Sequence, residues 1–337
     1  MQRPQSKLAC VCLLSCLAGL RSDTAPANET LRPCRIEVVD DKSGWPVPLV
    51  ELRSTNHVRF VTDNAGVIAM DDPSLMNRET WFTVIGHGYG VPADGFGNRG
   101  VRLRLEPGKT VTVRVKRFAI AKRIGRLTGG GLFAESQKLG EQADWRDGSI
   151  FGCDSVQNAV HRGRMFWAWG DTQIASYPLG IFDMTSATTR LQPFDSFQPP
   201  LRPKFKYFAN DDGRPRPVAK MPGKGPTWLT GYVSLPDKRG NQRLVAVYRK
   251  IKPPLEAYEA GLCIWDDDTE QFEHLRTTWR KSDKNSDPLM IADGHPAFWT
   301  DERGKKWLLF GNPLPRVRLS ATFEAWQDTS NWEEVTP

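Results

Sequence analysis

Cysteine is scarce in this chain once its first residues are set aside. Of the six cysteines, three lie before residue 20, and only Cys34, Cys153 and Cys263 follow. Three cysteines allow at most one intramolecular disulfide, which excludes a disulfide scaffold. The sequence also has no CxxC and no HExxH motif, which argues against a structural or catalytic zinc site. We therefore expect no metal centre and no required cofactor.

Long apolar runs are also missing. The one apolar stretch, residues 8–20, is short for a membrane span and follows Arg3 and Lys7, as in a signal peptide. We expect residues 1–27 to be a signal peptide with cleavage after the small residues at 25–27. The alternative is a lipobox at 13–16 that leaves Cys16 lipidated. Either way we expect an exported protein: secreted, periplasmic or a cell-surface lipoprotein, with residues 28–34 as a tether.

Acidic residues are outnumbered, and the net charge is +7. Such an excess favours anionic partners in general. Most basic residues are scattered among acids, however, and no nucleic-acid-binding motif is present. The densest basic run spans residues 114–126, and its last part, 118–126, is interpreted as a solvated connector. We expect a polysaccharide or glycan as partner, no nucleic acid, and membrane contact only through the lipid anchor.

The chain is rich in turn residues, with 25 prolines and 29 glycines, which favours an all-β protein. Residues 35–117 alternate short strands with turns such as "DDKSGWP", "TDNAG" and "EPGK", the pattern of a small β-sandwich. The layout "VVDDKSGWPVPLVEL…VTDNAGVIAM…VIGHGYG…EPGKTVTVRV" resembles the carboxypeptidase regulatory-like, transthyretin-like domain. The resemblance implies an accessory module without chemistry of its own, so His57 and His87 are not site candidates.

Residues 127–337 show a different rhythm. Three units each consist of a strand, a polar turn with glycine and an apolar strand, namely "DSVQNAVHRGRMFWAWGDT", "TWLTGYVSLPDKRGNQRLVAVYRK" and "DGHPAFWTDERGKKWLLFGN". Such repeats are typical of β-propeller blades. About three blades can be counted, fewer than a closed ring needs. We expect a β-propeller, most simply an incomplete one from a longer protein, although additional blades that the count misses are the alternative.

Two aspartates stand at the ends of the first unit. If Arg162-Gly163 forms a two-residue hairpin turn, Asp154 lies opposite Asp171, with Cβ atoms about 4.5–5.5 Å apart. Like charges in such positions are destabilising, which suggests that the pair has a chemical task. The alternative is that each aspartate hydrogen-bonds to the backbone at a strand end.

The motif "GCDSVQNAVHRGRMFWAWGDT" resembles the first blade of five-bladed β-propeller glycoside hydrolases, in particular an endo-arabinanase-like family. The resemblance implies that Asp154 and Asp171 lie in the central funnel and cleave glycosidic bonds. This sequence departs from the pattern of that wider group in the second unit, where "GPTWLTG" offers no carboxylate. Asp293 is then the candidate general acid, with Glu259 a weaker one, and the substrate-binding candidates are Trp169, Trp228 and His295.

These observations leave three functions open. The first is an exported polysaccharide-active enzyme, a hydrolase or a lyase, of which we favour a glycoside hydrolase. The second is a non-catalytic surface propeller that binds glycan or protein, or an inactive fragment. The third is a structural cation site, such as calcium, with oxygen ligands from the aspartate pair and from "DDDTEQ" at 266–271, although that segment is also typical of a hairpin turn.

Overall fold

The computed structural model describes residues 32–128, 134–145, 150–193, 196–282, 292–311 and 314–335. The chain is all-β, as the sequence predicts. Within the described ranges, 23 strands are accompanied only by a five-residue α-helix, α1 (Phe323–Gln327), and by short 3-10 turns such as η2 (Glu135–Leu139) and η4 (Thr329–Asn331). No helix in these ranges is long and apolar enough to cross a membrane. The expected signal peptide, with Cys16, and most of the tether lie outside the described residues.

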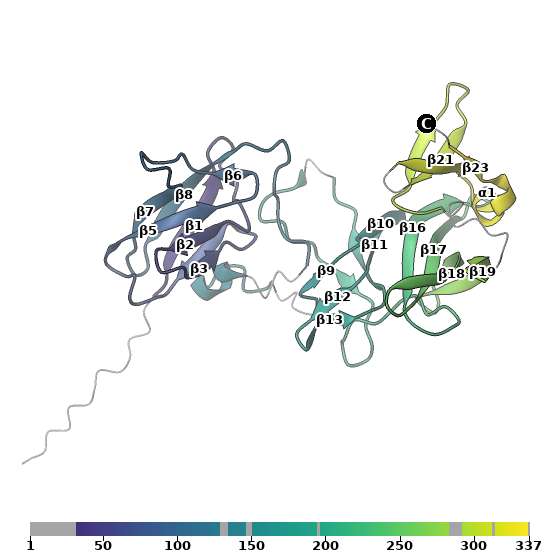
Figure 1. Ribbon diagram of the computed structural model, residues 1–337, viewed down its shortest axis with the longest axis horizontal. Coiled ribbons are helices and arrows are strands. Elements are labelled where there is room, and N and C mark those ends of the chain that lie inside the picture. Colours follow the sequence, from purple (N-terminus) through teal and green to yellow (C-terminus); the bar gives the residue numbers. More distant parts are fainter. Residues whose placement is uncertain are drawn as a thin grey trace, which may run out of the picture.

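The N-terminal part is a sandwich of two four-stranded sheets, the purple and blue region of Figure 1. One sheet has the order β4-β1-β8-β6, formed by Val67–Met70, Cys34–Asp40, Thr110–Arg117 and Tyr89–Gly90. The other has the order β3-β2-β5-β7, formed by Arg59–Val61, Glu51–Ser54, Glu79–Ile85 and Gly100–Arg104. Buried and half-buried residues alternate along β1, which places Ile36 and Val38 in the core between the sheets.

The sandwich is fastened to the rest of the chain through the turn at Asp63-Asn64. The Asn64 side chain donates to the carbonyl oxygens of Arg126 and Leu201, both at 3.0 Å. Asp63 accepts hydrogen bonds from the amide and hydroxyl of Ser136. The connector 118–126 is solvated in part, with Ile120 fully exposed, whereas its end at Arg126 is joined to the sandwich. Its Lys122 ammonium lies 3.1 Å from the centre of a tryptophan ring in the sandwich, a cation–π contact.

The remaining chain forms three four-stranded antiparallel sheets in sequence order, running from teal to yellow in Figure 1. Each begins with one of the three repeat units. The strands of the first are β10 (Gln157–His161), β11 (Arg164–Trp169), β14 (Thr185–Arg190) and β15 (Lys206–Tyr207). Those of the second are β16 (Thr227–Pro236), β17 (Gln242–Lys252), β18 (Glu256–Asp266) and β19 (Gln271–Arg280). Those of the third are β20 (Ala297–Thr300), β21 (Lys306–Gly311), β22 (Pro315–Ser320) and β23 (Glu333–Glu334).

The three sheets pack face against face like successive propeller blades. One buried cluster joins Phe166 and Ala168 of the first sheet to Leu229 and Tyr248 of the second. A separate cluster joins the other face of the second sheet to Leu308 and other apolar residues of the third. A small three-stranded sheet, β13-β12-β9 (Tyr177–Ile181, Thr172–Ile174, Gly152–Cys153), continues the β10–β11 hairpin at its open end. That open end carries the two aspartates.

Candidate functional site

The β10–β11 hairpin has the register that its turn predicts. Arg162 and Gly163 both have positive φ, as a two-residue type I′ turn requires. His161 pairs with Arg164 next to this turn, and the same register continues through Gln157 and Ala168. The register is unchanged beyond β10 and β11, where Cys153 of β9 pairs with Thr172 of β12.

Asp154 and Asp171 therefore lie directly opposite each other. The Asp154 amide donates to the Asp171 carbonyl oxygen at 3.3 Å, and the Gly170 amide donates to the Asp154 carbonyl oxygen at 3.0 Å. Their predicted opposition is confirmed. Neither carboxylate accepts a hydrogen bond from any residue that the structure describes, which contradicts the alternative of two strand-ending backbone caps.

The two carboxyl groups have different surroundings. Asp154 is exposed, whereas Asp171 is half-buried and its Oδ1 atom is buried without a hydrogen-bond partner. Burial, and to a lesser extent the charge of Asp154, raises the pKa of the Asp171 carboxyl above its ordinary value. Gly170 makes room for this arrangement, because a Cβ atom there would lie 2.5 Å from Asp154 Oδ1. One carboxyl of the pair is thus biased toward the protonated form.

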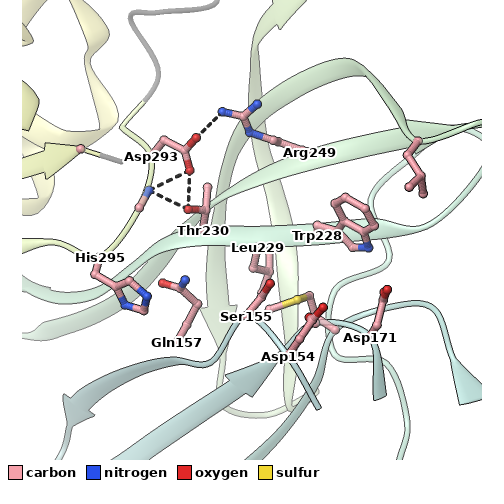
Figure 2. A pocket seen from close by; sticks show the side chains of 15 residues that line it. Asp154, Ser155, Gln157, Asp171, Trp228, Leu229, Thr230, Arg249, Asp293 and His295 are labelled. Atoms are coloured by element: carbon pink, nitrogen blue, oxygen red, sulfur yellow. Dashed lines mark hydrogen bonds and ion pairs between the residues drawn. The ribbon is translucent and has the colours of Figure 1, made fainter. Parts of the chain in front are cut away.

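The aspartate pair lines a cavity of about 810 Å³ between the three sheets (Figure 2). The second sheet contributes Trp228 and Thr230 from β16 and Arg249 from β17, and the segment before the third sheet contributes Asp293 and His295. Of the six site residues predicted from the sequence, five line this cavity. They are Asp154, Asp171, Trp228, Asp293 and His295.

Asp293 is held in place by three donors. Arg249 Nη2 lies 2.6 Å from Asp293 Oδ2, while Thr230 Oγ1 and the Gly294 amide donate to Oδ1 at 2.6 and 2.7 Å. Both carboxylate oxygens of Asp293 are therefore engaged by donors, and one of them by a cation. The ion pair disfavours the general-acid role that the sequence suggests for Asp293.

Sequence reasoning missed Arg249 and Thr230. A β-bulge at Gly231, whose φ is +60°, shifts the pairing of β16 with β17 by one residue and places Trp228 opposite Arg249. The same bulge leaves the Gly231 amide free to donate to the Gly294 carbonyl oxygen at 3.0 Å, which brings the Asp293 segment against β16. The two-residue period in "TWLT" was the available signal for Thr230, because it puts Thr230 on the same face as Trp228.

Trp169 is not part of the cavity, and the substrate-binding prediction for it is wrong. Its side chain is fully buried and makes edge-to-face and tilted ring contacts with Phe205 and Tyr207. A side chain with no exposed area cannot stack on a sugar, so Trp169 serves packing. Glu259 also lies away from the cavity lining, where it accepts a hydrogen bond from Tyr248 and forms an ion pair with Arg280 at 3.0 Å.

The residues that the structure describes include no group of three or more His, Cys, Asp or Glu side chains placed to hold a metal ion. In "DDDTEQ", Asp266 accepts hydrogen bonds from the amides of Asp268 and Thr269 within the turn between β18 and β19. This is the hairpin-turn role rather than that of a cation loop.

Comparison with known proteins assigns no family. No family model matches the chain, and no curated protein matches it. Among solved structures, it is similar to a candidate exo-β-1,3-galactanase from Bifidobacterium bifidum S17, with 11% identity and a TM-score of 0.27. The match covers 55% of this chain, which spans about half (51%) of that structure. A likeness at this level carries no argument about activity, and the resemblances to the regulatory-like and endo-arabinanase-like families stay predictions.

Proposed function

We propose that this chain is a glycoside hydrolase that cleaves a polysaccharide in the cavity between its three sheets. The observation that carries the proposal is the aspartate pair on the cavity wall: two like charges directly opposite each other, without any neutralising partner among the described residues. Such an arrangement costs stability and is therefore retained for a chemical task. A cavity of 810 Å³ is in the range that binds small ligands and sugar units.

The two carboxyls divide the work according to their surroundings. Asp171, whose pKa is raised, gives its proton to the glycosidic oxygen as the bond between that oxygen and the anomeric carbon breaks. Asp154, which is exposed, acts on the anomeric carbon by one of two routes. It takes a proton from a water whose oxygen forms the new bond to that carbon, or its own oxygen attacks the carbon and forms a glycosyl ester. In the second route water then cleaves the ester, with Asp171, now deprotonated, as the base. Which of these two routes is followed decides whether the configuration is retained or inverted.

The opposite wall holds the sugar. The Asp293–Arg249 pair is fixed by Thr230 and presents charged groups that can bind sugar hydroxyls. Trp228 offers part of an indole ring, an amphipathic surface that suits a sugar face, and His295 is exposed at the edge of the cavity. We propose in addition that residues 1–27 direct export, which would bring the enzyme to extracellular polysaccharides.

The first experiment is reducing-sugar release from a panel of neutral and acidic polysaccharides. It compares the intact chain with Asp154→Asn and Asp171→Asn, and uses Asp268→Asn as matched control because Asp268 lies in an exposed turn. We expect each active-site variant to lose about 10²- to 10⁴-fold in rate, the usual contribution of an acid or base, while the control keeps full activity. Activity unchanged in both variants, or none in the intact chain on any polymer, would refute the hydrolase proposal.

A second function, glycan binding without cleavage, is favoured by one observation. The second sheet contributes no carboxylate to the cavity, only Trp228, Leu229, Thr230 and Arg249. Retardation of the chain in gels containing each polysaccharide separates the two functions. A binder is retarded by a polymer that it does not cleave, and Asp154→Asn leaves the retardation unchanged.

A further inference from the structure

A second cleft lies at the other end of the β10–β11 hairpin, next to its turn and away from the aspartate pair. It has a volume of about 230 Å³ and lies between the first two sheets. His161, Arg164 and Phe166 come from the hairpin, Lys206 and Phe208 from the segment around β15, and Trp265 from β18. None of these residues has a part in the proposed hydrolysis.

The floor of this cleft is aromatic. Phe166, Phe208 and Trp265 are buried and contact one another, with ring centres 5.6 Å apart for Phe166 and Trp265 and 5.0 Å apart for Phe208 and Trp265. These contacts hold the floor rigid. A rigid apolar floor suits the carbon face of a small ring.

The rim has an excess of positive charge. Arg164 lies directly opposite Arg190 across β11 and β14, and Lys206 is a diagonal neighbour of Arg190 on β15. Like charges opposite each other are destabilising, as in the aspartate pair. None of the three forms an ion pair with any residue in the described ranges. Three cations at one edge, without an ion-pair partner in the part of the chain that the structure describes, favour an anionic ligand.

The acids near the cleft are already engaged. Asp267 forms an ion pair with Arg162 and accepts a hydrogen bond from Trp265 Nε1 at 3.1 Å. Glu270 lies 3.7 Å from the Arg216 guanidinium. Their charges are therefore balanced locally, and the charge of Arg164 and Lys206 remains for a ligand.

His161 adds an unsatisfied polar atom to the wall. Its side chain is 2% exposed, its Nδ1 lies 2.8 Å from Ser234 Oγ, and its Nε2 is buried without a partner. Ser234 donates its own proton to Gln242 Oε1, so His161 Nδ1 is the donor to Ser234. Burial lowers the pKa of His161, which favours the neutral ring. Because His161 lines the cleft, its Nε2 is then a buried acceptor without a hydrogen-bond partner among the described residues in the wall of the cleft.

We propose that this cleft binds a saccharide that carries an anionic oxygen group, such as a carboxylate or a sulfate. The anionic group pairs with Arg164 and Lys206, and the sugar ring lies over Phe166, Phe208 and Trp265, next to the wall that contains His161. Inorganic phosphate would satisfy the cations but would leave the aromatic floor unused. The site does not depend on hydrolysis, and it would hold an acidic polysaccharide at a distance from the catalytic pair.

The test is calorimetric binding to polymers that differ only in charge. The full chain, with Asp154→Asn to prevent any turnover, is titrated with dextran sulfate against dextran, and with polygalacturonate against its methyl-esterified form. The first pair tests sulfate and the second tests carboxylate. We expect binding of at least one charged member and of neither neutral member.

The matched variants locate the binding. Arg164→Gln/Lys206→Gln removes two exposed cations from the rim, and Lys238→Gln/Arg239→Gln removes the same charges from the exposed turn between β16 and β17. We expect the rim variant to bind at least tenfold more weakly, as loss of charge-assisted hydrogen bonds implies, and the control to change less than twofold. Equal weakening in both variants, unchanged binding in the rim variant, or no binding of either charged polymer would overturn the proposal. Circular dichroism verifies that both variants are folded.

Discussion

Replacing Asp171 with asparagine should make the protein more stable while it destroys activity. Asn is nearly the same size, so the change removes one of two charges on opposite residues, a position in which Cβ atoms are usually about 4.5–5.5 Å apart. Two charges about 5 Å apart at an effective dielectric constant of 20 repel by roughly 3 kcal/mol, an upper bound. Exposure of Asp154 to solvent reduces this, and about 0.2–1 kcal/mol is the usual scale for cross-strand pairs.

The gain in stability of Asp171→Asn should grow as the pH rises. The folded-state pKa of Asp171 is raised, so the native state of the wild type loses stability as pH rises from the unfolded value of about 3.9 through the folded one. Asp171→Asn does not titrate and does not show this loss. The two proteins should therefore melt alike near pH 3, and the variant should melt higher at pH 7.

Differential scanning calorimetry at both pH values measures the effect, which corresponds to a rise in melting temperature of about 0.4–4 °C at pH 7 for domains of this size. Asp268→Asn is the control, because it removes one charge from an exposed turn. A variant that melts lower than the wild type at pH 7, or a difference that is the same at pH 3, would refute the reasoning. The opposite directions of stability and activity are the signature of a functional pair rather than a structural one.

Three further outcomes follow from the site. Gly170→Ala should lower activity at least tenfold with little loss of stability, because the new Cβ would lie 2.5 Å from Asp154 Oδ1 and displace that carboxylate. A variant with the wild-type rate would contradict this prediction. Arg249→Gln should raise the Michaelis constant more than it lowers the turnover number, since it removes an ion pair on the sugar-binding wall; the reverse split in steady-state kinetics would place the arginine in the chemistry. Trp169→Ala should lower the free energy of unfolding by about 3–5 kcal/mol in urea melts, whereas Trp228→Ala should lower it less and weaken substrate binding. Equal losses of unfolding free energy would mean that both rings serve packing.

The aspartate pair could be found from sequence because every step that leads to it is local. Arg162-Gly163 forms the turn, the register starts at that turn, and no bulge interrupts it before the pair. Alternation with a period of two then puts both carboxyls on one side of the hairpin. The same reasoning applied to the second unit fails at one residue.

In the β16–β17 hairpin, Pro236 pairs with Gln242. If this register continued without a bulge, Trp228 would lie opposite Lys250. The bulge at Gly231 sets it opposite Arg249 instead. Lys250 is in fact buried, where its ammonium donates to the Gly225 carbonyl oxygen at 2.6 Å. A slip of one residue exchanges the two faces of a strand, so the position of one glycine decides which cation enters the cavity.

The sequence by itself determined the all-β class, the three repeat units, the first hairpin and the opposition of Asp154 and Asp171. These rest on turn chemistry and strand alternation, which act between near neighbours. Only the tertiary structure decided that Asp293 is held by Arg249 and Thr230, and that Trp169 is covered by Phe205 and Tyr207. Those contacts join residues that are far apart in the chain. They depend on how the sheets pack face against face, and no short stretch of sequence predicts that packing.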